Sequence, residues 1–239
     1  YCTFLGDYLL ITNLKECFLY NREGKYIKII GSVGRGPGEY DFALSVGFDS
    51  DTNIYIQSLY DLLEFRKDGS FLKKDKNFFM LNNSMDEFFQ NWIIVNDSLF
   101  FGLIQNTTGL VNDKALLKNK NHKIVKSYTN YILFKRRTPL TGELGEKENV
   151  HKFKNHIYYK EQYNDTLFCL NENFGMIPIY TFRLDKFKEP LSEREAVRHG
   201  NYKMKYIYVN CVFQTDNYLF LDCDFGPASI SLYNPVVYK

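Results

Sequence analysis

Short apolar runs recur along the chain at long intervals. They read YLLI at 8–11, IYIQ at 54–57, LFFG at 99–102, IYYK at 157–160 and YLFL at 218–221. Successive runs are 45, 45, 58 and 62 residues apart, measured between their centres, which are Leu10, Tyr55, Phe100, Tyr158 and Phe220. Self-similarity at such a period is typical of repeat architectures, in which each repeat is one small supersecondary unit.

Each run belongs to a longer unit of short strand-like segments. One segment precedes the run (CTFL, LSVGF, NWIIV, VHKFK and VNCVF) and another follows it. Turns containing glycine come next, such as NREG at 21–24 and RKDG at 66–69, and a fourth segment closes most units. Asp-Gly is a strong hairpin signal. Four short strands in a unit of about 40–50 residues predict a β-propeller blade. Five such blades are visible.

The composition supports a sheet protein. The chain has 19 Tyr and 21 Phe, and its alanines are only Ala43, Ala115, Ala196 and Ala228. Aromatic side chains suit a pleated, half-buried surface, whereas alanine favours helices. A four-stranded meander cannot bury both of its faces alone, but stacked meanders can, which explains the continuous apolar runs. We therefore expect an all-β propeller of four-stranded antiparallel blades, forming a single domain over residues 1–239.

Longer polar links connect the predicted blades. They cover 31–43, 75–90, 135–149 and 183–206. In the last link, Ser192 and Glu195 fit a capping box and Gly200 fits a helix stop, so we expect a short helix at about 192–199, before the last visible blade. The segment SMDEFF at 84–89 predicts a second, weaker helix.

The glycine-rich stretch GSVGRGPGEY at 31–40 allows two interpretations. A phosphate-binding loop would need a lysine after the glycines or a helix after a GxGxxG spacing. Here Pro37 interrupts the spacing and the following segment is strand-like. A joint between two blades explains both the glycines and the flanking strands.

Two stretches resemble a known family. Residues 18–74 resemble two consecutive NHL-type propeller repeats, and GRGPGEY at 34–40 and YYKEQYNDTLF at 158–168 resemble six-bladed β-propeller proteins of Bacteroidetes, many of which are predicted lipoproteins. The resemblance implies six blades, so either the sixth is missing from this chain or weakly patterned segments complete it. It also implies an extracytoplasmic location, in the periplasm or at the outer-membrane surface, with a lipid anchor lying outside this chain.

The same resemblance implies where ligands bind. In such propellers the first strand of each blade lines a central channel. The links from second to third strand, and from fourth strand to the next blade, emerge on one face, which we call the long-link face. Long loops on a rigid scaffold commonly carry function. The candidate ligand-binding residues on this face are Lys160, Glu161, Tyr163, Arg35, Glu39, Asp222 and Asp224.

Each candidate has an alternative interpretation. Arg35 and Glu39 could simply pair with each other or with a neighbouring blade. Lys160 and Glu161 directly follow a buried run, where charge must be compensated, either by a ligand or by pairing within the protein. Asp222 and Asp224 fit either a cation site or turn solvation.

Catalytic and metal-binding patterns are not recognisable. His151 and His156 belong to one blade, but no third ligand accompanies them, so no metal is assigned. There is no CxxC pair and no Ser-His-Asp arrangement in a recognisable context. We therefore assign no catalytic residue and no cofactor. The formal net charge of +2 is spread evenly, which argues against nucleic acid, and no run reaches the ~18 apolar residues of a membrane span.

The expected function is a non-catalytic, exported or cell-surface propeller. It would bind a carbohydrate, a peptide or a protein partner on the long-link face. The alternatives are a propeller hydrolase or lyase with a divalent metal in the channel, and a structural scaffold in a surface assembly.

Overall fold

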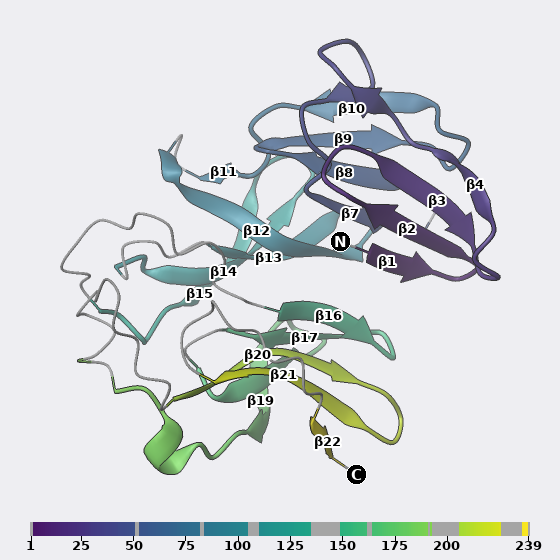
Figure 1. The fold of residues 1–239 in the computed structure, drawn as a ribbon. Coiled ribbons are helices and arrows are strands. Elements are labelled where there is room, and N and C mark those ends of the chain that lie inside the picture. The colour runs from purple at the N-terminus through teal and green to yellow at the C-terminus, as the bar shows by residue number, and fades with distance from the viewer. Residues whose placement is uncertain are drawn as a thin grey trace. The chain divides into compact units, whose positions relative to one another are not determined.

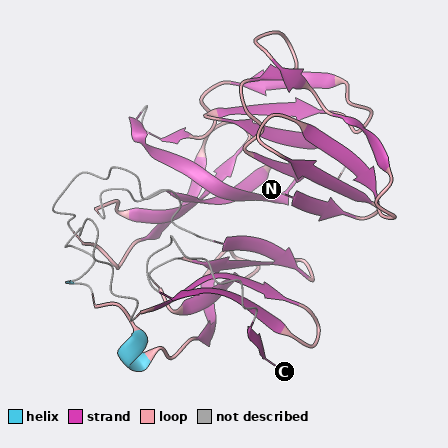
Figure 2. Cartoon of the chain, viewed as in Figure 1, coloured by secondary structure: helices cyan, strands magenta, loops and turns pink. Residues whose placement is uncertain are grey.

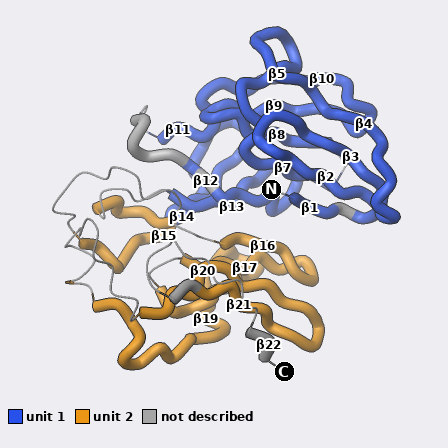
Figure 3. Tube along the Cα trace, viewed as in Figure 1, with its two compact units in different colours: residues 1–104, 115–127 blue, residues 105–114, 128–239 orange. Residues whose placement is uncertain are grey.

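Antiparallel meanders make up nearly all of the regular structure (Figures 1 and 2). The computed structural model describes residues 2–50, 53–81, 84–104, 110–134, 149–161, 164–190, 192, 206–225 and 236–238. Two compact units are distinguished, residues 1–104 with 115–127 and residues 105–114 with 128–239 (Figure 3). Each unit is described by itself.

The first two meanders have four strands each and belong to the first unit. The first consists of β1 (Cys2–Leu5), β2 (Tyr8–Thr12), β3 (Cys17–Asn21) and β4 (Tyr26–Ile29). The second consists of β7 (Ser45–Phe48), β8 (Ile54–Ser58), β9 (Asp61–Phe65) and β10 (Phe71–Asp75). Between them lies a small parallel pair, β5 (Ser32–Val33) and β6 (Glu39–Tyr40). The glycine-rich stretch is therefore a joint between two sheets, as predicted.

The remaining meanders follow the same order. The third sheet contains β11 (Met80–Leu81), β12 (Ser84–Asn96), β13 (Leu99–Ile104), β14 (Asp113–Asn119) and β15 (Ile124–Thr129). The fourth contains β16 (Asn149–Phe153), β17 (His156–Lys160), β18 (Thr166–Leu170) and β19 (Met176–Thr181). The described strands of the fifth are β20 (Ile207–Gln214), β21 (Leu219–Phe225) and β22 (Val236–Tyr238).

The predicted fold class is confirmed. The protein is all-β, and its four-stranded antiparallel blades have a propeller arrangement. The first strands of consecutive blades approach each other inside each unit: β1 and β12 both contact β7, and β16 contacts β20. The apolar runs that defined the repeat lie in β2, β8, β13, β17 and β21. Each of these is the second strand of a meander, if the third meander is counted from β12 and the two-residue strand β11 is an addition at its edge.

Packing between the first and second sheets forms the core of the first unit. Leu10 and Leu19 from the first sheet are buried against Ile56, Leu63 and Phe65 from the second. The joint contributes Tyr40, whose hydroxyl donates to the backbone carbonyl of Ile30 at 3.1 Å. Each sheet thus gains its dry interior from the next sheet, which is the physical basis of the repeat.

The weaker helix prediction is wrong. Residues 84–89, predicted as a helix, form the beginning of the strand β12. Phe88 pairs with Met80 on β11, and Phe89 pairs with Ile104 on β13. Backbone pairing with β11 and β13 outweighs local helix propensity here, because helix propensity is a weak preference.

The link before the fifth sheet contains a short helical turn in its described part. This is η1 (Asp185–Phe187), a 3-10 helix. The helix predicted at about 192–199 lies outside the described residues, apart from Ser192.

Candidate functional site

Glu161, a predicted ligand-binding residue, lies directly after β17 at the start of the link to β18. Its side chain is only 10% exposed, and Lys114 Nζ lies 3.3 Å from its Oε1. The Tyr159 hydroxyl donates to Oε2 at 2.7 Å, and Asn164 Nδ2 donates to Oε1 at 2.5 Å. Both carboxylate oxygens are therefore satisfied by protein groups, which compensates the buried charge.

Lys160 lies beside this cluster as the last residue of β17. It is 1% exposed, and its Nζ donates to the backbone carbonyl of Glu161 at 2.6 Å. The sequence reasoning thus identified a real cluster of buried charge. The structure places this cluster at the start of the link from β17 to β18. Lys114 from β14 also belongs to the cluster, and the sequence analysis missed it. Tyr163 lies outside the described residues.

Replacing Glu161 with glutamine is expected to destabilise the protein by about 2 kcal/mol, because the Lys114 ammonium keeps its burial and loses its counter-charge. Urea unfolding followed by circular dichroism measures the change. The matched control is Glu172→Gln at an exposed position of the same unit, which should change the free energy of unfolding by less than about 0.5 kcal/mol. Equal effects of the two variants would contradict a structural ion pair at Glu161.

Arg35 and Glu39 lie in the joint between the first two sheets. Arg35 is exposed, and within this described joint the two side chains form no ion pair. Instead, the carboxylate of Glu39 folds back and accepts the backbone N–H of Gly36 at 2.6 Å. A Cβ at position 34 would overlap this carboxylate, so a larger residue there would displace the Glu39 side chain. The alternative that these two residues pair with each other is wrong, because the Glu39 carboxylate instead accepts a hydrogen bond from the backbone of its own loop.

Asp222 and Asp224 both lie inside the strand β21. Asp222 is partly buried and pairs with Cys211 on β20, and Asp224 pairs with Tyr208. The turn-solvation alternative is therefore wrong, since neither residue is in a turn. The side chain of Asp224 is outside the described set.

Two leucines that the sequence analysis did not select have an unusual backbone. Leu14, in the link from β2 to β3, has φ 77°, and Leu59, between β8 and β9, has φ 50°. Positive φ is rare for large side chains and costs about 1–2 kcal/mol. Both side chains are nevertheless exposed, by 54% and 44%. The two positions are 45 residues apart, so the repeat places them at equivalent turns of the long-link face.

Phe42 lies between these two turns. It is 45% exposed, and its backbone N–H donates to Ser58 Oγ, next to Leu59, at 3.5 Å. The following residue, Ala43, donates its N–H to the carbonyl of Leu14 at 2.8 Å, and its own carbonyl accepts the Thr12 hydroxyl at 2.5 Å. The backbones that carry Leu14, Phe42 and Leu59 are thus fastened together. We call these three residues the apolar triad. In the sequence, the 45-residue spacing of Leu14 and Leu59 was the signal that could have identified them as equivalent positions.

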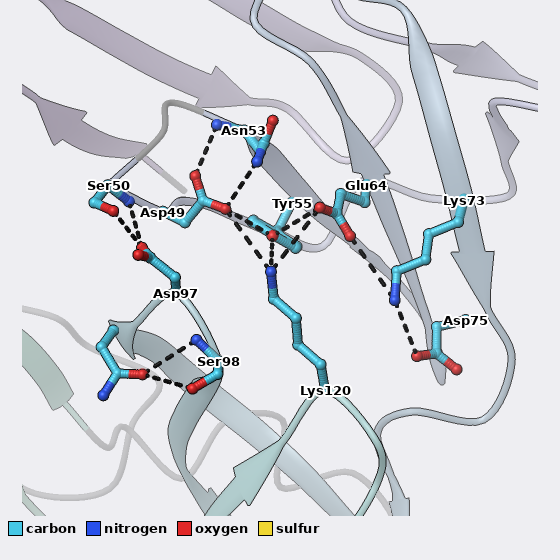
Figure 4. A network of polar contacts seen from close by, with 11 residues as sticks. Asp49, Ser50, Asn53, Tyr55, Glu64, Lys73, Asp75, Asp97, Ser98 and Lys120 are labelled. Atoms are coloured by element: carbon cyan, nitrogen blue, oxygen red, sulfur yellow. Dashed lines mark hydrogen bonds and ion pairs between the residues drawn. The ribbon is translucent and has the colours of Figure 1, made fainter.

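A second polar cluster joins the second and third sheets, at the ends of β7 and β14 (Figure 4). The Tyr55 hydroxyl lies 2.8 Å from Asp49 Oδ2 and 2.9 Å from Glu64 Oε1. Lys120 Nζ donates to the same hydroxyl at 2.7 Å and lies 3.9 Å and 4.0 Å from the two carboxylates. Burial, followed by the adjacent carboxylates, raises the pKa of Tyr55.

The charge balance of this cluster depends on Lys120. A phenol carries one proton and can donate to only one carboxylate at a time. Asp49 and Glu64 are both buried, and Lys120 brings positive charge to both from the turn after β14. Lys73 lies 3.9 Å from the other oxygen of Glu64. The cluster lies at the end of the sheets opposite to the apolar triad, because Asp49 follows a first strand and Lys120 follows a third strand. The polar cluster therefore connects the second and third sheets through hydrogen bonds and ion pairs.

No metal centre is found in the described part of the chain, where no three or more His, Cys, Asp or Glu residues are grouped suitably for an ion. Nor does any helix within those residues have the length and apolar character to cross a bilayer.

Comparison with known families and structures places the chain among its relatives. Residues 1–236 match the family described as "Domain of unknown function (DUF4934)". The chain belongs to the DUF4934 family. No protein of curated function matches this DUF4934 member.

Solved structures similar to the DUF4934 chain include proteins of Bacteroides. A protein of Bacteroides fragilis, described as exported, has a TM-score of 0.70 and 17% identity, and the match covers 95% of this chain and 65% of that one. A member of the DUF4221 family from Bacteroides vulgatus has a TM-score of 0.59 and 10% identity, with 95% and 70% coverage. A virginiamycin B lyase variant from Staphylococcus aureus, at a TM-score of 0.44 and 10% identity, covers 90% of this chain and 59% of its own, a likeness too distant to bear on chemistry. The DUF4934 chain thus spans about two thirds of the exported protein and shares its fold.

Proposed function

We propose that this protein is an exported, non-catalytic binding module that recognises a peptide or protein partner on its long-link face. The observation that carries the proposal is the pair of exposed leucines in a left-handed backbone, Leu14 and Leu59, at equivalent turns. Strain held at a fixed position is a pointer to function, because the fold alone would be better served by another residue. Exposed leucine and phenylalanine tips offer no hydrogen-bonding group, which favours apolar side chains of a polypeptide over a carbohydrate.

The fastened backbone supports the same proposal. The Thr12 hydroxyl and the Ala43 N–H donate hydrogen bonds, and the Ser58 hydroxyl oxygen accepts one from the Asp41 N–H. These bonds fix the links that carry the apolar triad. A surface that is already ordered loses little conformational entropy on binding, so even a small apolar contact adds to affinity. Export is supported by the fold shared with the Bacteroides protein described as exported and by the family resemblance of residues 34–40 and 158–168.

The remaining candidates have a supporting role in this proposal. Glu161 and Lys160 hold the link after β17 in shape, and Glu39 does the same for the glycine-rich joint. Arg35, Tyr163, Asp222 and Asp224 are proposed as peripheral contacts. Alanine variants of these four should weaken binding less than changes in the apolar triad.

Replacing both Leu14 and Leu59 with asparagine is expected to separate stability from binding. Asparagine tolerates positive φ, so the free energy of unfolding should stay equal or rise by about 1 kcal/mol. Binding of peptides selected from a phage-displayed random library should fall at least about tenfold. Thermal unfolding and fluorescence polarisation with a selected peptide measure the two effects.

The control replaces Ile177 and Ile179, which are similarly exposed on β19, with asparagine. This variant should bind the selected peptides as the unchanged protein does. A glycan array run in parallel tests the other ligand class. Enrichment of glycans without any enrichment of peptides, or equal binding by the Leu14 and Leu59 double variant, would contradict the proposal.

A further inference from the structure

A buried lysine of the third sheet reaches into the link that leads from the second sheet. Lys118, on β14, is 3% exposed, and its Nζ donates a hydrogen bond to the backbone carbonyl of Phe78, in the link between β10 and β11. The same nitrogen lies 4.7 Å from the centre of the Phe78 ring. An ammonium has three N–H donors. In the described part of the chain, those of Lys118 therefore meet only one carbonyl oxygen and one aromatic face.

The positive charge of Lys118 has no paired carboxylate among the described residues. Asp75, on β10, instead lies 2.6 Å from His122 Nε2 and 3.9 Å from Lys73 Nζ. An ammonium that loses its hydration without forming an ion pair is costly to bury. Accordingly, burial lowers the pKa of Lys118 to about 8 from the ordinary value of 10.5, against a smaller opposing effect of Asp75. The charged or titratable groups on neighbouring elements are Asp75 and Lys73 on β10, Lys76 in the following link, Tyr55 on β8, Glu64 on β9, and Lys120 and His122 in the turn after β14.

The carbonyl that accepts from Lys118 belongs to a peptide group that also holds the turn of Leu59. The carbonyl of Phe78 and the N–H of Phe79 are the two polar ends of one planar peptide bond. The Phe79 N–H donates to the backbone carbonyl of Tyr60 at 2.9 Å, and Tyr60 directly follows Leu59. Phe78 and Phe79 are fully buried, so water does not compete for this peptide group. One rigid peptide plane thus connects the amine of Lys118 to the turn that carries Leu59, within the first unit.

We propose that Lys118 is a positioning residue whose proton regulates the apolar triad, because the charged amine holds the Leu59 turn and loss of the proton loosens it. This inference rests on the proposed function, in which the triad is the binding surface. A hydrogen bond from a charged donor is about twice as strong as a neutral one, and a polarised peptide group strengthens the bond at its other end. The left-handed backbone of Leu59 persists only while its surroundings hold it, so it is sensitive to this bond.

Loss of the proton at Lys118 is expected to have opposite effects on binding and on stability. Affinity for a peptide should fall about threefold between pH 7 and pH 9, because the charged hydrogen bond becomes a neutral one. Stability from this group should instead rise between pH 8 and 10.5, where the unfolded chain binds the proton and the folded chain does not. Weaker binding at pH 9 therefore does not come from unfolding. Since coupling is reciprocal, a bound peptide should raise the pKa of Lys118.

Fluorescence polarisation at pH 7 and pH 9, with a peptide selected at pH 7 from the phage-displayed library, tests the effect on binding. The unchanged chain should lose about threefold in affinity. Lys118→Met keeps the length of the lysine stem and does not titrate, so its affinity should be the same at both pH values. The matched variant Lys123→Met, at an exposed position of the following turn, should retain the decrease.

An NMR titration without peptide separates this inference from the proposed function. The amide signal of Phe79 should shift with a midpoint near pH 8 in the unchanged chain and in Lys123→Met, but not in Lys118→Met. A Phe79 signal that ignores Lys118, or an affinity of Lys118→Met that falls with pH as in the unchanged chain, would overturn the inference while leaving peptide binding in place. A library without enriched peptides would overturn the proposed function, and with it the regulation of binding, whatever the Phe79 signal does.

Discussion

Replacing Lys120 with methionine is expected to destabilise the protein by about 3 kcal/mol, because the change leaves buried Asp49 without its counter-charge and leaves Glu64 with only Lys73, 3.9 Å from its other oxygen. Asp49 Oδ2 and Glu64 Oε1 lie 3.9 and 4.0 Å from the Lys120 ammonium, and Asp49 is only 3% exposed. Methionine keeps the length and apolar contacts of the lysine stem. The decrease in the free energy of unfolding therefore measures the removal of the charge. Urea unfolding followed by Trp92 fluorescence measures it, since Trp92 donates to Gln57 Oε1 at 2.8 Å and so senses contact between the second and third sheets.

Two further variants make this prediction specific. Lys123→Met alters an exposed lysine in the same turn and should change the free energy of unfolding by less than about 0.5 kcal/mol. Combining Lys120→Met with Glu64→Gln removes one carboxylate together with the ammonium and should recover at least about 1 kcal/mol. If Lys120→Met costs no more than Lys123→Met, the cluster is not the cross-link described here.

Acid is expected to weaken the second unit through His151, which lies on β16. Its Nδ1 donates to Asn149 Oδ1 at 3.0 Å, and its ring stacks on Tyr158 with centroids 5.4 Å apart. The other ring nitrogen, Nε2, is buried without a hydrogen-bond partner. Asn149 Oδ1 also accepts the backbone N–H of Val212 on β20 at 3.2 Å, so this corner joins two sheets.

Burial lowers the pKa of His151 to about 4 from the ordinary value of 6.5. Between these two pH values the unfolded chain binds the proton and the folded chain does not. Stability from this group is therefore fully present above pH 6.5 and falls as the pH decreases toward 4. The loss amounts to about 3 kcal/mol over the whole window.

Replacing His151 with phenylalanine keeps a ring against Tyr158 and removes the titrating group. The variant should lose some stability near neutral pH, because Asn149 loses a hydrogen-bond donor, but its stability should vary less between pH 6.5 and 4. Urea midpoints in buffers across this window measure both effects. The comparison variant His156→Phe, at an exposed position, should retain the pH dependence of the unchanged chain. If the stability of His151→Phe fell between pH 6.5 and 4 as much as that of the unchanged chain, His151 would not be the source of the pH dependence.

The strands could be predicted from the sequence because their signals are local. Continuous apolar runs, glycine turns and a regular interval each depend on a few neighbouring residues. Gly24 and Gly69, 45 residues apart, indeed adopt positive φ at the turns before β4 and β10. The prediction failed at residues 84–89, where an acidic, aromatic segment resembles a helix in isolation and is held as a strand by partners on β11 and β13.

The site was harder to predict, because its determinants are separated in the sequence. Lys120 meets Tyr55 across 65 residues, and Lys114 meets Glu161 across 47. No pattern in either segment identifies its partner. The positive φ of Leu59 was equally hidden, because leucine is a residue that local rules assign to negative φ. The charged pair Lys160 and Glu161 was found, since charge beside a buried run is itself a local anomaly.

The cluster around Tyr55 has a consequence for biosynthesis. A ribosome releases Asp49 and Glu64 well before it releases Lys120, since chains emerge from the N-terminus and domains fold in that order. The second sheet therefore exists for a time as a nascent element in which Lys73 lies near Glu64 but the lysine that pairs with Asp49 has not yet been made. It reaches its mature electrostatic state only when the turn after β14 has been translated, so folding of the first unit waits for Lys120, which follows Tyr55 by 65 residues.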